Sequence, residues 1–406
     1  SGPTLVGRFP TLLALKMAKN SSRSVSQKCW PKNWATDCVL FAALLSGCSL
    51  WGGSKVKLPE LGENVPLLGV RQAWSAKVGG GGAKPLDVRV QEHLVTIAAA
   101  DGSVAALDAR TGGDLWRTNV GEPLSAGVGT DGRYAAVVSH ANALVLLDQG
   151  KEVWRQTLPS QVFTAPLIAG GRVFVLAADR SVSAFDLATG KKLWSQARTG
   201  GDALVLKQSG VILAVGDTLV VGAAGRMVGH NPDTGSIRWE VPLASPRGVN
   251  DVERLVELVG RVSRVGDSVC ARAFQAAVGC VNITRDRASV SWTQSANGSE
   301  GVHGDAETVY GTESNGNVLA WRRSDGARVW SSDRLKLRKL TSPLLLGRSV
   351  VVGDGEGWVH FLSRTDGAPL NRVSTDSSGI AAAPVVAADT LVVITRNGGV
   401  FGFRPE

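Results

Sequence analysis

Histidine and cysteine carry the most reactive side chains in this sequence, and their spacing limits the reactions open to it. The five histidines are scattered without the spacing of metal ligands, at His93, His140, His230, His303 and His360. The chain also contains no His-Glu-x-x-His motif, no Gly-x-Ser-x-Gly nucleophile turn and no phosphate-binding glycine loop. We therefore expect no catalytic residue, no metal ion and no cofactor, and we expect each histidine to be an ordinary loop or strand residue.

Cys48 is the cysteine whose surroundings indicate a reaction. A basic stretch over residues 19–32 precedes a short apolar run at 38–45, which ends in the tetrapeptide Leu45-Ser46-Gly47-Cys48. The run is too short to span a bilayer, which needs about 20 apolar residues. The arrangement resembles the signal peptide and lipobox of bacterial lipoproteins, which implies cleavage before Cys48 and attachment of lipid to its thiol.

That resemblance divides the N-terminal region. Residues 1–47 are expected to be an N-terminal extension and signal peptide, and residues 48–68, which have Gly, Pro and Ser without clear periodicity, to be a lipid-anchored tether. Ser49 after the cysteine resembles the signal that sends such lipoproteins to the outer membrane. We therefore expect a protein anchored by lipid to the periplasmic face of the outer membrane.

The positive charge of the chain is concentrated at its N-terminus. The formal net charge is +9, and residues 1–47 hold six Lys or Arg and one acidic residue, which leaves 38 basic and 34 acidic residues for the remainder. No basic run with interleaved aromatic residues occurs in that remainder. Nucleic acid is therefore not an expected partner.

A repeat of about 40 residues organises the rest of the chain. Three copies, 101–116, 179–194 and 315–330, each run from a turn to a Trp 15 residues later. Leu370 takes the corresponding place 40 residues after the last Trp of the series, whose members lie at positions 74, 116, 154, 194, 239, 292 and 330. This period, combined with short apolar or alternating strands and Gly-containing turns, predicts the four-stranded antiparallel blades of a β-propeller.

The two ends of the repeat region complete one another. The last copy, 391–403, stops after three strands, whereas the first Trp unit, 70–74, has no three strands before it. Joining the two gives one complete blade and leaves no free sheet edge. We therefore expect an all-β, eight-bladed propeller over residues 69–406, closed by its N-terminal strand.

The blade fingerprint Ala-x-Asp-x-x-Thr-Gly-x-x-x-Trp, seen at 184–194, resembles the pyrroloquinoline-quinone-type propeller repeat. Quinoprotein dehydrogenases share this repeat, so a periplasmic dehydrogenase of that type is the alternative function. That resemblance would require a disulfide between adjacent cysteines and acidic calcium ligands at the propeller axis, whereas Cys270 and Cys280 are ten residues apart.

With its lipobox, short tether and eight such blades, the chain is more similar to the BamB family, the propeller lipoproteins of the outer-membrane β-barrel assembly machinery. The segments 340–358 and 376–385 resemble the last blades of that family, and the resemblance covers residues 45–406. It implies a non-catalytic scaffold that binds the periplasmic domains of the barrel-forming subunit BamA. It also implies contact with the rest of the assembly complex and with unfolded outer-membrane proteins.

Two connections between blades are longer than the others. From each Trp to the next second strand the chain usually takes 17 to 20 residues, but it takes 25 after Trp194 and 30 after Trp239. Consecutive crossovers lie side by side on one face, so the segments 195–218 and 240–268 predict one raised patch.

The family resemblance indicates the same patch. The family's partner-binding Leu-x-Leu-Arg motif is matched by 204–207, with Lys in place of Arg, and its Asp-x-Asp after Asp-Arg-Leu aligns with 253–259, where Val259 replaces the second acid. The partner-binding residues implied in this way are Leu204, Leu206, Lys207, Arg254 and Glu257. The alternative makes the two leucines core residues of an inner strand and 250–259 a solvated loop.

Cys270 and Cys280 flank a predicted hairpin turn in an exported domain, where oxidation is permitted. A turn centred on Gln275 would place the two cysteines directly opposite each other, whereas a two-residue turn at 275–276 would send them to opposite faces of the sheet. The sequence leaves the disulfide open between these two registers.

Overall fold

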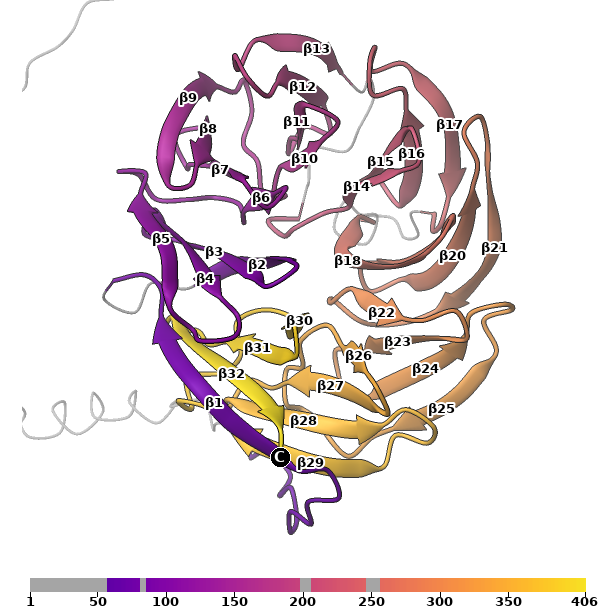
Figure 1. Ribbon diagram of the computed structural model, residues 1–406. Coiled ribbons are helices and arrows are strands. Elements are labelled where there is room, and N and C mark those ends of the chain that lie inside the picture. Colours follow the sequence, from indigo (N-terminus) through magenta and orange to yellow (C-terminus); the bar gives the residue numbers. More distant parts are fainter. Residues whose placement is uncertain (1–56, 81–84, 198–205, 246–255) are drawn as a thin grey trace, which may run out of the picture. The chain divides into compact units, whose positions relative to one another are not determined.

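The structure of this chain is a computed structural model, which describes residues 57–80, 85–197, 206–245 and 256–406. The chain divides into two compact units, 1–57 and 58–406. In the second unit, eight four-stranded antiparallel sheets are arranged as blades around a common axis (Figure 1). The predicted eight-bladed propeller is confirmed.

We number the blades in chain order, starting with the first sheet formed by four consecutive strands. The first four blades consist of β2 (Pro85–Gln91), β3 (Leu94–Ala99), β4 (Ser103–Asp108) and β5 (Asp114–Asn119); β6 (Gly129–Thr130), β7 (Tyr134–Val138), β8 (Ala143–Asp148) and β9 (Lys151–Thr157); β10 (Leu167–Ala169), β11 (Arg172–Leu176), β12 (Val182–Asp186) and β13 (Lys192–Gln196); and β14 (Ile212–Val215), β15 (Thr218–Ala223), β16 (Arg226–His230) and β17 (Ile237–Pro242).

The remaining blades consist of β18 (Leu258–Val265), β19 (Ser268–Ala273), β20 (Ala277–Ile283) and β21 (Ala288–Ser295); β22 (Val302–Gly304), β23 (Thr308–Thr312), β24 (Val318–Arg322) and β25 (Arg328–Ser332); β26 (Leu344–Leu346), β27 (Ser349–Gly353), β28 (Trp358–Ser363) and β29 (Pro369–Ser374); and, for blade 8, β30 (Val385–Ala387), β31 (Thr390–Ile394), β32 (Gly399–Pro405) and β1 (Val70–Lys77).

Blade 8 closes the ring in the way that the sequence predicts. Strand β1 pairs antiparallel with β32, with Val70 opposite Pro405 and Lys77 opposite Gly399. The outer strand of the last blade therefore comes from the start of the propeller, and pairing it removes the sheet edge that would otherwise remain free.

The hydrophobic core lies between blades. The second and third strands of each blade are buried on both faces, as in the run Tyr134–Val138, because a neighbouring blade covers each side. In the described part of the chain the buried side chains form eight clusters, and each cluster joins one pair of adjacent blades. Burial between blades, at about 25 cal/mol per Å² of apolar area, is the main stabilising contribution.

The recurring Trp residues dock each blade onto the next. At the junction of blades 5 and 6, Trp292 on β21 donates its indole N–H to the carbonyl oxygen of Arg323 over 2.6 Å. Gly326 lies in the turn that follows at φ 73°, where a Cβ would come within 2.5 Å of the Trp292 ring. The glycine of the Thr-Gly or Asp-Gly turn is therefore needed because it has no Cβ, so that an indole can lie directly against the backbone.

The same indole-to-carbonyl bond recurs at four other junctions. Its donors and acceptors are Trp74 and Ala109, Trp154 and Leu187, Trp194 and Pro232, and Trp330 and Arg364, over 2.8 to 2.9 Å. Strand pairing makes each blade, and this bond with its glycine contact sets the register between blades.

The described part of the tether differs from the flexible segment expected from the sequence. Arg372 on β29 donates to the carbonyl oxygens of Leu61 and Gly62, and Arg338 donates to that of Pro59. Leu61 also packs against the core between blades 6 and 7. Residues 58–68 lack periodicity because they form no strand, yet arginine side chains hold them along blade 7.

Candidate partner-binding site

The two long connections meet on one face of the propeller. Because the strands of a blade alternate in direction, the crossovers between blades and the turns between second and third strands lie on the same face. The described ends of the two crossovers, 206–211 and 256–257, therefore lie beside the turns of blades 3 and 4. Leu204 and Arg254, which the sequence also assigns to this patch, are outside the described residues, as is Cys48.

The segment 206–210 is held from three sides. The Gly210 N–H donates to Thr164 Oγ1 over 2.9 Å, and the Gly260 N–H donates to the Ser209 carbonyl oxygen over 3.0 Å. The Gln208 side chain reaches the Ser299 carbonyl oxygen over 2.6 Å. Blades 3, 5 and 6 thus fix this segment, which fits a segment that presents side chains to a partner.

The segment is not part of an inner strand. Strand β14 begins at Ile212, so Leu206 and Lys207 precede it. Leu206 is half-buried and Lys207 is exposed. In the described half of the leucine pair, Leu206 is therefore neither in a strand nor fully buried, and its contact with a partner stays a prediction.

Glu257 lies deeper than a rim residue would. Its side chain is 14% exposed, and Oε1 accepts hydrogen bonds from Nε and Nη2 of Arg180 over 2.9 and 2.6 Å. Its other oxygen, Oε2, accepts the Ala224 N–H over 3.1 Å. Arg180 belongs to blade 3, Ala224 to blade 4, and Glu257 leads into blade 5, so one carboxylate links three blades.

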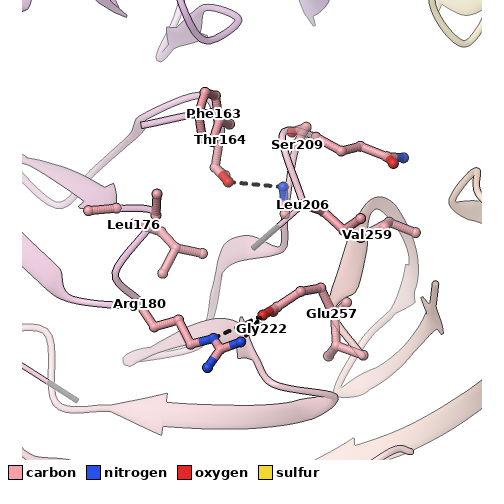
Figure 2. A pocket seen from close by; sticks show the side chains of 14 residues that line it. Phe163, Thr164, Leu176, Arg180, Leu206, Ser209, Gly222, Glu257 and Val259 are labelled. Carbon is pink, nitrogen blue, oxygen red and sulfur yellow. Dashed lines mark hydrogen bonds and ion pairs between the residues drawn. The ribbon is translucent and has the colours of Figure 1, made fainter. Parts of the chain in front are cut away.

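A small recess of about 50 Å³ lies between these groups. Figure 2 shows the Arg180–Glu257 ion pair on one side of it and Leu206 with Ser209 on the other. Val259, which replaces the second acid of the family motif, lines the recess and is 1% exposed. The recess is lined by apolar side chains, by the uncharged polar side chains of Thr164, Gln208 and Ser209, and by one neutralised ion pair, so it suits an uncharged side chain better than a charged one.

Arg180 is the residue of this site that the sequence reasoning did not single out. It occupies the turn position that is Gly102 in blade 1 and Gly316 in blade 6, and its φ of 64° is in the left-handed region. A non-glycine residue there costs about 1–2 kcal/mol. An arginine at a position where blades 1 and 6 have glycine was a signal that its side chain is needed.

Blade 5 next to the site contains the two cysteines. Cys270 lies opposite Cys280 across the β19–β20 hairpin, which is the register with the turn centred on Gln275. Their sulfur atoms form a disulfide, and both residues are buried. The bond closes a hairpin whose inner neighbour, β18, begins directly after Glu257.

Two searches of the described residues bear on function. No group of three or more His, Cys, Asp or Glu is placed to hold a metal ion in that part of the chain. Within the same residues, no helix is long and apolar enough to cross a membrane.

The fold and its tryptophan-docking repeat define an eight-bladed propeller of the quinone-type repeat class. A family model described as outer membrane protein assembly factor BamB matches residues 100–332. The outer membrane protein assembly factor BamB of Burkholderia pseudomallei is 39% identical over 380 residues, which cover 92% of this chain and 99% of that protein. The chain belongs to the BamB family.

Solved structures agree on the fold. The crystal structure of BamB from Moraxella catarrhalis matches with a TM-score of 0.75 at 23% identity and covers 82% of this chain and 99% of that one. The quinohemoprotein alcohol dehydrogenase from Comamonas testosteroni matches with a TM-score of 0.61 at 15% identity, over 84% of this chain and 78% of that one. The second match shows a shared fold and supports no shared activity.

Proposed function

We propose that this chain is a non-catalytic docking protein of outer-membrane protein assembly, and that it binds the periplasmic domains of a BamA-type subunit. Family membership supports the assembly role, because its relatives carry that function in their names. The observation that supports the binding site is the segment 206–210, which three blades hold in place with Lys207 exposed.

In this proposal the partner contacts Leu204, Leu206 and Lys207, with Arg254 on the neighbouring crossover. Leu206 and the adjoining recess take an apolar side chain, and Lys207 pairs with an acidic group at the edge. Glu257 acts indirectly, since its ion pair with Arg180 holds the wall of the recess. It differs in this from the exposed acid expected from the family motif.

The test is a pull-down of BamA periplasmic domains with the variant Leu204→Ala, Leu206→Ala, Lys207→Glu. Binding should be lost while the melting temperature stays within a few degrees, because Lys207 is exposed, where a change typically costs under about 0.5 kcal/mol, and Leu206 is half-buried and outside any strand. The matched control is Leu337→Ala with Lys339→Glu on the crossover between blades 6 and 7, where both residues are exposed. If the triple variant binds BamA periplasmic domains as well as the control does, the partner binds another surface of the propeller.

The anchor is proposed to be lipid on Cys48. Multiple acyl chains, each gaining about 0.8 kcal/mol per buried CH₂, would hold the propeller firmly at the membrane. Cys48→Ala should therefore move the protein from the membrane fraction to the soluble periplasm. Retention of that variant in membranes after a high-salt wash would refute the anchor.

The chain is proposed to have no catalytic activity. Adding pyrroloquinoline quinone with calcium to the purified protein should give no oxidation of alcohols or sugars. Turnover that depends on the quinone would restore the dehydrogenase alternative.

A further inference from the structure

A hollow of about 820 Å³ lies on the axis of the propeller. Residues from the innermost strand, or from the approach to it, line this axial funnel in all eight blades, including Val88, Ala126, Phe163, Leu213, Val262, His303, Ser342 and Val385. The volume is in the range of small-molecule binding sites. Because the funnel and the recess at Glu257 share the segment 208–210, they are neighbours on the same part of the molecule.

The wall of the funnel carries more positive than negative charge. Four cationic side chains line it, namely Arg89, Lys207, Arg261 and Arg264, against two carboxylates, namely Asp87 and Glu300. Asp87 is paired with Arg89 at 3.1 Å. Glu300 makes an interaction of its own. Within the part of the chain that the structure describes, no ion pair joins a carboxylate to Lys207, Arg261 or Arg264.

Arg261 is the least exposed of these four cations. The register of β18 against β19 shifts between Val259 and Ser263, which takes residue 261 out of the ladder. Gly301 packs against it so closely that a Cβ there would lie 2.2 Å from the Arg261 carbonyl oxygen. Nη1 donates to the Pro384 carbonyl oxygen over 2.8 Å, which satisfies one of the five N–H donors of a guanidinium.

The surroundings of Arg261 increase the cost of its charge. Burial lowers the pKa of Arg261 to about 10, and the charge of nearby Arg89 lowers it further while Asp87 opposes this. His303 beside it adds no compensation, because burial lowers the pKa of His303 to about 3 and its Nδ1 accepts the Leu345 N–H. A guanidinium that stays charged at neutral pH without a carboxylate partner is stabilised by any oxyanion that reaches it.

We propose that the axial funnel binds a small oxyanion ligand that carries two or more carboxylate or phosphate groups, with Arg261 as its principal contact and Arg264 and Lys207 as further contacts. The planar fork of arginine matches carboxylate and phosphate oxygens. The cations lie on β18 and on the approach to β14, so one anionic group does not neutralise them all. Valine, leucine and alanine side chains of the wall would contact the body of the ligand.

The experiment is isothermal titration of the purified full chain with citrate and with pyrophosphate, each against sodium chloride at the same ionic strength. Saturable binding with one site per chain is expected for at least one of the two probes, and acetate, with a single carboxylate, should bind more weakly. Arg261→Gln should weaken binding by at least about tenfold, which corresponds to about 1.4 kcal/mol. Arg71→Gln, at an exposed arginine on β1, is the matched control and should bind as the parent does.

A second variant tests the same site if Arg261→Gln does not fold. Arg264→Gln removes a second funnel cation and should also weaken binding. Absence of saturable binding by both probes, or equal binding by the two funnel variants and the parent, would overturn the proposal. Binding of a hexaglutamate peptide without binding of citrate or pyrophosphate would overturn it in favour of an acidic polypeptide.

Discussion

The junction between blades 5 and 6 and the junction between blades 4 and 5 use the same residue type in different ways. At the first, the indole N–H of Trp292 is bonded to the Arg323 carbonyl oxygen and the ring lies on Gly326. At the second, Trp239 is equally buried at 7% exposure, but its indole nitrogen has no hydrogen-bond partner among the residues that the structure describes. Blade 5 has Arg285 and Asp286 in the turn where blades 1, 3, 4, 6 and 7 have Thr-Gly or Asp-Gly.

The difference shows that the junction between blades 4 and 5 has lost the indole contact of the repeat and has gained another interaction. Between blades 4 and 5 the contact through the turn is missing, and the carboxylate of Glu257 instead ties blades 3, 4 and 5 together on the opposite face. The longest crossover of the chain is at this junction. Junctions with the indole bond thus maintain the ring, and the irregular junction between blades 4 and 5 supports the proposed binding site.

The largest effect should follow from removing the indole of a regular junction. Trp292→Ala deletes a buried ring and leaves the Arg323 carbonyl oxygen without its donor, so the free energy of unfolding should fall by about 3–5 kcal/mol. Urea denaturation followed by circular dichroism measures it. A loss below about 1 kcal/mol would mean that strand pairing alone holds the blades.

The carboxylate of the irregular junction should come next. Glu257→Ala leaves the nearly buried Arg180 guanidinium without its partner, and we expect a loss of about 2–4 kcal/mol. In the double variant Arg180→Met, Glu257→Leu the unpaired charge is absent, so part of this loss should be recovered. If the double variant loses as much stability as Glu257→Ala or more, the ion pair does not link the blades.

A smaller effect is expected at the glycine under the indole. Gly326→Ala requires φ of 73° and places a Cβ 2.5 Å from the Trp292 ring, which should cost about 2 kcal/mol or more. Gly347→Ala is the matched control, since Gly347 also has positive φ, at 55°, but has nothing within 4 Å of its Cβ position. Equal melting temperatures of the two variants would show that the close contact between Gly326 and the indole does not matter for stability.

The smallest expected change in the free energy of unfolding comes from losing the indole hydrogen bond alone. Trp292→Phe and Trp239→Phe both replace an indole by a phenyl ring at equally buried sites, but only the first breaks a hydrogen bond. The first should therefore be more destabilising by about 1 kcal/mol, the usual net contribution of such a bond. A larger loss for Trp239→Phe would reverse the comparison.

The regular parts of the fold were predictable because each repeat contains its own turn, strands and Trp. The blade number, the closure by residues 70–77 and the location of the long crossovers follow from spacing alone. The disulfide register between Cys270 and Cys280 was open, since it depends on one residue of the turn.

Other features depend on contacts between distant segments, which spacing does not encode. The bond between Arg180 and Glu257 spans 77 residues. The hydrogen bond from Arg372 to the carbonyl oxygen of Leu61 in the tether joins residues that are 311 positions apart. The cations of the axial funnel come from blades 1, 4 and 5, and only the ring brings them together.

The most direct test of the proposed binding site is photo-crosslinking at position 207 in cells. A photoreactive phenylalanine analogue replaces Lys207 in one strain and Lys339 in another, and both positions are exposed on crossovers. The account predicts a crosslink from position 207 to the BamA periplasmic domains and none from position 339. A crosslink from 339 with none from 207 would contradict it.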